Sequence, residues 1–181
     1  MNSIGIAFDI VPSEYEEVLD DSRSATDVAI ELGLGKAQEV ASRYPQAVVI
    51  GSDTIVSFDG HQLGKPIDKD DATKMLKNLR GKTCVVTTSV AVSCVALNIQ
   101  LVGVDTAELK IKNLTDDEIA MYVASGLPMD KAGSIGAQDM NGLLVDEIVG
   151  DYDTVLGLSS KLVRKFLKEV QHSNPSSKQA T

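Results

Sequence analysis

Histidine and cysteine are scarce in this chain, with two residues of each type among 181. His61 and His172 stand alone, and Cys84 and Cys94 lack the spacing of metal ligands. A zinc site or a histidine-based catalytic triad is therefore not expected. Both cysteines fall in an apolar, strand-like stretch, so we predict two buried free thiols in a reducing compartment.

Long apolar runs and an excess of positive charge are also missing. No run reaches the roughly 20 residues that span a membrane, and the N-terminus lacks the basic-then-apolar pattern of a signal peptide. We therefore expect a cytoplasmic protein with no membrane partner. The 17 Lys and Arg residues against 26 Asp and Glu give a net charge of −9, which argues against a nucleic-acid polymer as partner. The net charge does not exclude a small anionic ligand, provided that a few lysines converge around it.

What is present is an ordinary globular composition, with 43% hydrophobic and 24% charged residues. We predict a single domain over residues 1–171. Residues 172–181 are polar and contain Pro and Ser, so we predict a disordered tail there.

Strand-like and helix-like segments are mixed along the chain. We predict strands at 7–11, 47–50, 55–58, 83–97, 101–111 and 143–149, and helices at 26–44, 68–79, 115–125 and 159–170. Thr115 and Glu118 form a capping box at one helix start, and Asp59-Gly60 is a hairpin-type turn. This combination favours an α/β fold with a mixed sheet flanked by helices.

Asp53 is the acidic residue best placed for chemistry, because it follows the buried run 47–50 in the stretch VVIGSDTIV. Open α/β sheets bind ligands at the carboxyl ends of their strands. After eleven intervening residues, Lys65 lies in the turn Gly64-Lys65-Pro66. A carboxylate facing this lysine could take a proton from water beside a bound phosphate. Lys65 could equally be a plain surface lysine.

Lys36 interrupts the apolar stripe of its predicted helix, in which Val28, Leu32 and Val40 recur at four-residue spacing. Its ammonium either reaches water from the edge of the stripe or points into a cleft and meets phosphate oxygens. The sequence pattern leaves both open.

The loop at 129–138 is rich in small residues and contains Lys131. Its glycines either expose backbone N–H groups to an anion or form an ordinary turn. If Lys36, Lys65 and Lys131 converge, the three ammonium groups would match a polyphosphate and offset the adverse net charge.

Glu14, Glu16 and Glu17 form an acidic stretch near the N-terminus. Such a stretch is usually a solvated face. One of the three could instead join Asp53 in holding a hard cation such as magnesium.

Five blocks in this order resemble the Maf family, the septum-formation-protein-like nucleoside triphosphate pyrophosphatases. The blocks are LGLGKA, VVIGSDTIV, LGKPIDKDDATKMLKNLRGK, MYVASGLPMDKAGSIGAQ and GDYDTVLGLS. Order and spacing agree from about residue 6 to residue 170. The resemblance implies a Maf-like, inosine-triphosphatase-like fold with two lobes around a central cleft.

The resemblance also implies roles for residues of this chain. Asp53 matches the general base that activates water, and Glu17 matches the family's glutamate after the second strand of the first lobe, here expected to bind substrate. The implied reaction uses a divalent metal, Mg²⁺ or Mn²⁺, for which Asp53 and Glu17 are the candidate ligands. Lys36, Lys65 and Lys131 match lysines of the triphosphate cleft. Gln138 matches the glutamine of the dTTP/UTP-type subgroup, where an amide can pair with a pyrimidine edge.

The implied reaction is hydrolysis of a nucleoside triphosphate, such as dTTP, UTP or a modified pyrimidine nucleotide, to the monophosphate and pyrophosphate. A homodimer is a further expectation from the family.

Two departures from the family pattern are visible. Ile135 stands where the family usually has Tyr or Phe, which would weaken a stacking contact. The Ser-x-Ser-Pro-Arg-Arg segment with which the family opens does not precede the strand predicted at residues 7–11. This favours, as an alternative, a nucleotide-binding or interaction protein with impaired catalysis. A second alternative is an inosine-triphosphate-type purine pyrophosphatase.

Overall fold

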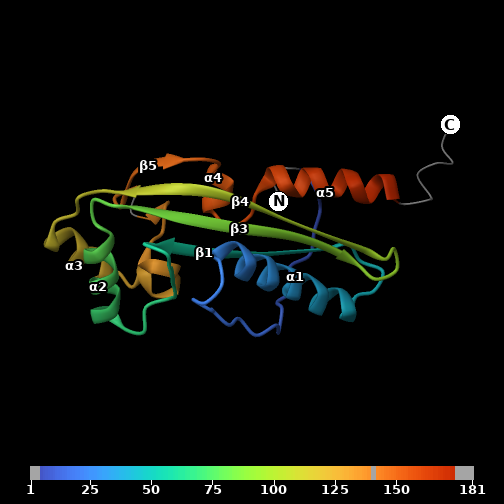
Figure 1. The fold of residues 1–181 in the computed structure, drawn as a ribbon, viewed down its shortest axis with the longest axis horizontal. Coiled ribbons are helices and arrows are strands. Elements are labelled where there is room, and N and C mark those ends of the chain that lie inside the picture. Colours follow the sequence, from blue (N-terminus) through green and yellow to red (C-terminus); the bar gives the residue numbers. More distant parts are fainter. Residues whose placement is uncertain (1–4, 140–141, 174–181) are drawn as a thin grey trace.

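The computed structural model describes residues 5–139 and 142–173. A five-stranded sheet in the order β2-β1-β3-β4-β5 runs through the molecule (Figure 1). The strands are β1 (Val49–Phe58), β2 (His61–Leu63), β3 (Thr83–Cys94), β4 (Ile99–Ile111) and β5 (Val145–Val149). The α-helices are α1 (Ala25–Arg43), α2 (Lys69–Leu79), α3 (Asp116–Ala124), α4 (Tyr152–Val155) and α5 (Ser160–Ser173). Two short 3₁₀ helices are η2 (Leu127–Asp130) and η3 (Ala132–Ser134).

The α/β class and the flanking helices are confirmed, but the four strand pairs of the described residues are all antiparallel rather than mixed. Short connections account for two of these four pairs. β1 turns into β2 through Asp59-Gly60, and β3 turns into β4 through residues 95–98. Short hairpins produce antiparallel neighbours, whereas the lengths of predicted elements carry no information on strand direction.

Three of the predicted strands differ from the structure. The strands predicted at 47–50 and 55–58 are one continuous strand, β1, because the polar residues between them pair with β3, Asp53 opposite Ser89. Asp53 therefore lies in the middle of a strand and not at its end. Residues 7–11 form no strand, and the side chain of Ile10 is 83% exposed.

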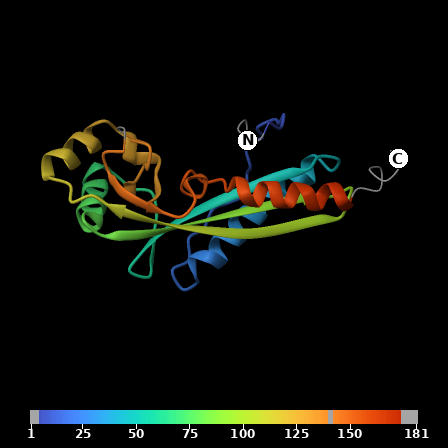
Figure 2. The same ribbon diagram turned by 90° about the horizontal axis from the view of Figure 1, so that it is seen from above.

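Helices α1 and α5 cover opposite faces of the long strands (Figure 2). Successive strand side chains point to opposite faces. Val90 and Val92 of β3 pack against α5, whereas Ser89, the residue before Val90, lies beside Gly33 of α1.

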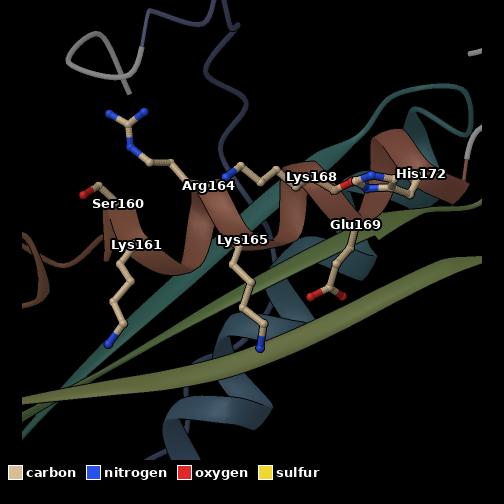
Figure 3. Close-up of a pocket in the computed structure, with 7 residues that line it drawn as sticks. All are labelled: Ser160, Lys161, Arg164, Lys165, Lys168, Glu169 and His172. Atoms are coloured by element: carbon tan, nitrogen blue, oxygen red, sulfur yellow. The ribbon is translucent and has the colours of Figure 1, made fainter.

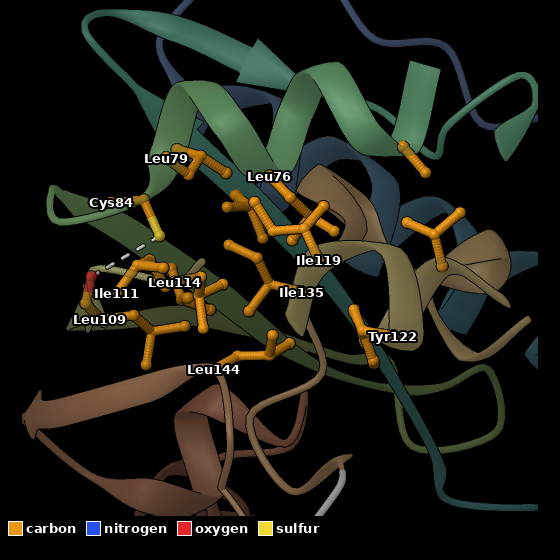
Figure 4. Close-up of a cluster of buried hydrophobic side chains, with 14 residues drawn as sticks. Leu76, Leu79, Cys84, Leu109, Ile111, Leu114, Ile119, Tyr122, Ile135 and Leu144 are labelled. Carbon is orange, nitrogen blue, oxygen red and sulfur yellow. Dashed lines mark hydrogen bonds between the residues drawn. The ribbon is translucent and has the colours of Figure 1, made fainter. Parts of the chain in front are cut away.

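The larger core lies at the other end of the sheet, between the strands, α2 and α3 (Figure 4). Leu76 and Leu79 of α2 and Tyr122 of α3 are almost completely buried there. The capping box predicted at Thr115 and Glu118 is present and begins α3. This end of the molecule also carries η2 and η3, which hold the loop around Lys131.

The C-terminal part of the chain departs from prediction at one point. Residues 172 and 173 were placed in a disordered tail but continue α5. The rest of the predicted tail, residues 174–181, lies outside the described residues. Cys84 and Cys94 are buried and free, as predicted. None of the described helices is long and apolar enough to cross a membrane.

Candidate active site

Asp53 is held against α1 by an unusually close helix-strand approach. Its side chain is 9% exposed. A Cβ atom on Gly51 would lie 2.6 Å from the carbonyl oxygen of Gly33 and 2.7 Å from the amide nitrogen of Ala37. Only glycine at position 51 leaves room for the helix backbone here. The contact brings the turn of α1 that carries Lys36 directly over Asp53.

The ammonium of Lys36 joins two carboxylates. Its Nζ donates to Oδ1 of Asp53 at 2.6 Å and lies 2.6 Å from Oε1 of Glu17. Of the two possibilities for Lys36, the cleft placement is therefore the one observed. Burial would lower the pKa of Lys36, but its hydrogen bonds to Asp53 and Glu17 outweigh burial and leave that pKa raised.

The two carboxylates respond in opposite ways. Burial raises the pKa of Asp53, and the nearby Lys36 opposes this rise without cancelling it. The hydrogen bond from Lys36 lowers the pKa of Glu17 below its ordinary value. Asp53 is thus the carboxylate better suited to accept a proton, because its affinity for one is higher than normal.

Glu17 is positioned by a segment that runs along the outside of α1. The hydroxyl of Ser13 donates to Glu39 at 3.0 Å, and the ring of Tyr15 covers Gly35. A Cβ atom at Gly35 would lie 2.3 Å from Cζ of Tyr15. The helix glycine therefore makes room for the ring that fixes this segment.

A cleft of about 390 Å³ brings together five of the six predicted site residues: Glu17, Lys36, Asp53, Lys65 and Lys131. Gln138, the sixth, is exposed and is not among the lining residues, although the adjacent Ala137 is. Its predicted contact with a base stays a prediction.

The cleft lies along an edge of β1. Ser52, Thr54 and Val56 line it together with Asp53, although alternate residues of a strand point to opposite faces. β2 pairs with β1 only over Val56–Phe58. The lining thus passes around the edge of β1 where pairing with β2 stops, so one cleft reaches both faces of the sheet.

The charged part of the cleft is electrically balanced, with three lysines and three carboxylates in its lining. Asp130 is the carboxylate that the sequence prediction missed, although it directly precedes Lys131. Nζ of Lys131 donates to Oδ1 of Asp130 and to the carbonyl oxygen of Leu127, each at 2.7 Å. Lys65 is exposed, and its charge helps to lower the pKa values of Glu17 and Asp130.

Apart from Ser52, Thr54 and Gly157, the remainder of the lining is aliphatic. Its apolar side chains include Val56, Val86, Leu109, Ile135 and Leu156. No aromatic side chain is among the lining residues of the described chain. A planar ligand group would therefore lie against branched aliphatic side chains and not against a stacked ring.

The carboxylates of Asp53 and Glu17 could bind an ion such as Mg²⁺, but the described residues would supply only these two ligands. Asp53 and Glu17 converge on the position of the Lys36 ammonium, but within the described ranges no group of three or more His, Cys, Asp or Glu residues could hold a metal. Mg²⁺ is commonly bound through one or two carboxylates, with substrate phosphates and waters as its other ligands. The pair Asp53 and Glu17 matches that pattern.

A second, more open groove lies on the outer face of α5 and shares no lining residue with this cleft (Figure 3). Lys161 and Lys165 point to one side of the helix, and Arg164 and Lys168 to the other. Glu169 is the one carboxylate among its lining residues. Without a pair of carboxylates or a buried base, this groove lacks the groups needed for hydrolysis.

Comparisons with known proteins show which family the chain belongs to. The family model described as Maf-like protein matches residues 1–170. A dTTP/UTP pyrophosphatase of Dictyoglomus turgidum is 39% identical over 174 residues, which cover 96% of this chain and 90% of that protein. A dTTP/UTP pyrophosphatase of Bacillus anthracis is 41% identical over 163 residues, covering 90% of this chain and 84% of that protein. This chain belongs to the Maf family.

Proposed function

We propose that this protein hydrolyses nucleoside triphosphates to the monophosphate and pyrophosphate, with dTTP and UTP as preferred substrates. The observation that carries the proposal is a buried carboxylate of raised pKa, Asp53, in a cleft with three lysines. The printed names of the relatives support the substrate class.

Asp53 would act as the general base. It accepts a proton from water, the water oxygen bonds to the α-phosphorus, and the bond from that phosphorus to the bridging oxygen breaks, so that pyrophosphate leaves. Phosphoryl chemistry depends mainly on positioning and on neutralising charge. Lys36, Lys65 and Lys131 would supply positive charge to the phosphates, and the aliphatic part of the cleft would hold the base.

Glu17 and Asp53 are the residues that would hold a divalent ion. Such an ion, Mg²⁺ or Mn²⁺, would neutralise phosphate charge and help to orient the triphosphate. The carboxylates can reach it only if the Lys36 ammonium turns away from the point between them. Lys36 can then interact with the phosphates instead, which fits its long and flexible stem.

A cytoplasmic location and a homodimer are part of the proposal as well. Two buried free thiols are consistent with a reducing compartment. Subcellular fractionation and sedimentation would check the two statements separately.

The experiment that tests the proposed reaction is product analysis with dTTP, UTP, ITP and GTP in the presence of Mg²⁺ or Mn²⁺. We expect equal amounts of monophosphate and pyrophosphate, with dTTP and UTP turned over fastest. Preference for ITP would favour the purine-type alternative. Saturable calorimetric binding of dTTP without turnover would favour a nucleotide-binding protein, and it would contradict the enzymatic proposal.

A further inference from the structure

We propose that Asp139, anchored by Tyr122, is a positioning residue that fixes the ammonium of Lys131 at the rim of the cleft. The kinetic part of this inference rests on the proposed pyrophosphatase function. The contacts themselves do not, and they can be tested without substrate.

Tyr122 anchors Asp139 to the hydrophobic core. It lies on α3 with no exposed surface, inside the core described above. Its hydroxyl donates to Oδ2 of Asp139 at 2.7 Å. Burial raises the pKa of Tyr122, and the hydrogen bond to Asp139 raises it further, so the phenol stays protonated and remains a donor. Helix α3 thereby holds the carboxylate.

Asp139, held by Tyr122, in turn holds the ammonium of Lys131. The same Oδ2 atom lies 3.5 Å from Nζ of Lys131. The Asp139 side chain is 10% exposed, and a carboxylate so deeply buried needs a positive partner. Among the described residues, Lys131 is the one cation that forms an ion pair with it.

Lys131 therefore has two anionic partners of different character. Asp130 belongs to the cleft lining and its side chain is 80% exposed, whereas Asp139 lies behind the lining. When a phosphate replaces Asp130 as acceptor, Asp130 can turn into water. Asp139 cannot move in this way, because Tyr122 holds it.

The loop backbone is shaped around the same contact. A Cβ atom at Gly136 would lie 2.0 Å from Oδ2 of Asp139 and 2.8 Å from Cε of Lys131. Position 136 thus has no room for a side chain while Asp139 and Lys131 are in place. This close packing is independent of the hydrogen bond to Tyr122 and points to the same function, immobilisation of the lysine.

The test uses Asp139→Asn, which keeps the shape and can still accept from Tyr122 but removes the charge. Lys131 loses one of two anionic partners, so its reactivity toward a limiting amine-acylating reagent should rise roughly three- to tenfold, as expected for one charged hydrogen bond. Peptide mass spectrometry measures this, with Lys65 of the same molecule as internal reference. Asp146→Asn is the control, because Asp146 is exposed, pairs with Lys110 rather than Lys131, and does not line the cleft.

With dTTP as substrate, Asp139→Asn should raise KM roughly three- to tenfold and change kcat less than about twofold, because the lost interaction orients a binding group. Tyr122→Phe should change KM in the same direction. Unchanged Lys131 reactivity in Asp139→Asn, with thermal unfolding like that of the wild type, would overturn the inference. If wild-type protein has no turnover, the proposed function fails but the reactivity experiment still decides on Asp139.

Discussion

At the scale of single residues, the charge state of Asp53 depends on Lys36. A nearly buried carboxylate loses much of its hydration, which raises its pKa, and the Lys36 ammonium 2.6 Å away limits that rise. Lys36 thus keeps a base of raised pKa ionised. Glu17 shares the same ammonium and is the more solvated of the two carboxylates.

Replacing Lys36 by Met should raise the pKa of Asp53 further, because burial would remain and the main compensating charge would be gone. A general base acts only when deprotonated, and its activity is lost as pH falls through its pKa. The acidic limb of the residual pH-rate profile should therefore move to higher pH. Carboxyl ¹³C NMR of Asp53 measures the pKa directly.

Lys161→Met serves as the control for that measurement, since Lys161 lies on α5, pairs with Asp105, and neither residue lines the cleft. It should leave the pKa of Asp53 unchanged. An Asp53 pKa that falls in Lys36→Met, or does not move, would contradict the role assigned to Lys36.

At the scale of secondary-structure elements, the site depends on the close contact of α1 with β1. Gly51→Ala should destabilise the fold by about 1–3 kcal/mol, because the new methyl group would meet helix backbone at Gly33 and Ala37. Backbone atoms cannot rotate away as a flexible side chain can. The midpoint of chemical denaturation would measure the loss.

Gly64→Ala is the matched control, because the nearest atom to a Cβ there is Cδ1 of Leu19 at 3.6 Å, an ordinary contact. Its free energy of unfolding should differ from that of the wild type by less than about 0.5 kcal/mol. Equal stability of both variants would show that α1 does not need this close approach.

Local signals predicted elements well, and non-local pairing explains the errors. The capping box at Thr115 and the turn at Asp59-Gly60 are decided by neighbouring residues, so both could be recognised from sequence. The polar stretch around Ser52 and Asp53 looks like a break in a strand. It is strand because Ser52 pairs with Val90 and Asp53 with Ser89, 38 and 36 positions away, and single-sequence patterns do not contain that information.

At the scale of the whole molecule, the cleft depends on where distant segments meet. Sequence reasoning found Asp53, Lys36, Lys65 and Lys131, because each stands beside an unusual backbone or pattern feature. It did not find Asp139, whose partners are Tyr122, 17 residues away, and Lys131.

The chain carries −9 overall, yet three lysines balance three carboxylates in the cleft. A triphosphate would therefore meet a locally neutral site within an acidic molecule.

The most direct test of the account is pyrophosphate release by wild-type protein and Asp53→Asn, with dTTP and Mg²⁺, beside the control Asp146→Asn, which lies outside the cleft lining. Loss of a general base should lower kcat by at least about 100-fold, while the control keeps wild-type activity. Circular dichroism would show whether the variant keeps its fold. Turnover by folded Asp53→Asn at a rate within a few-fold of the wild type would contradict the central claim that Asp53 activates water.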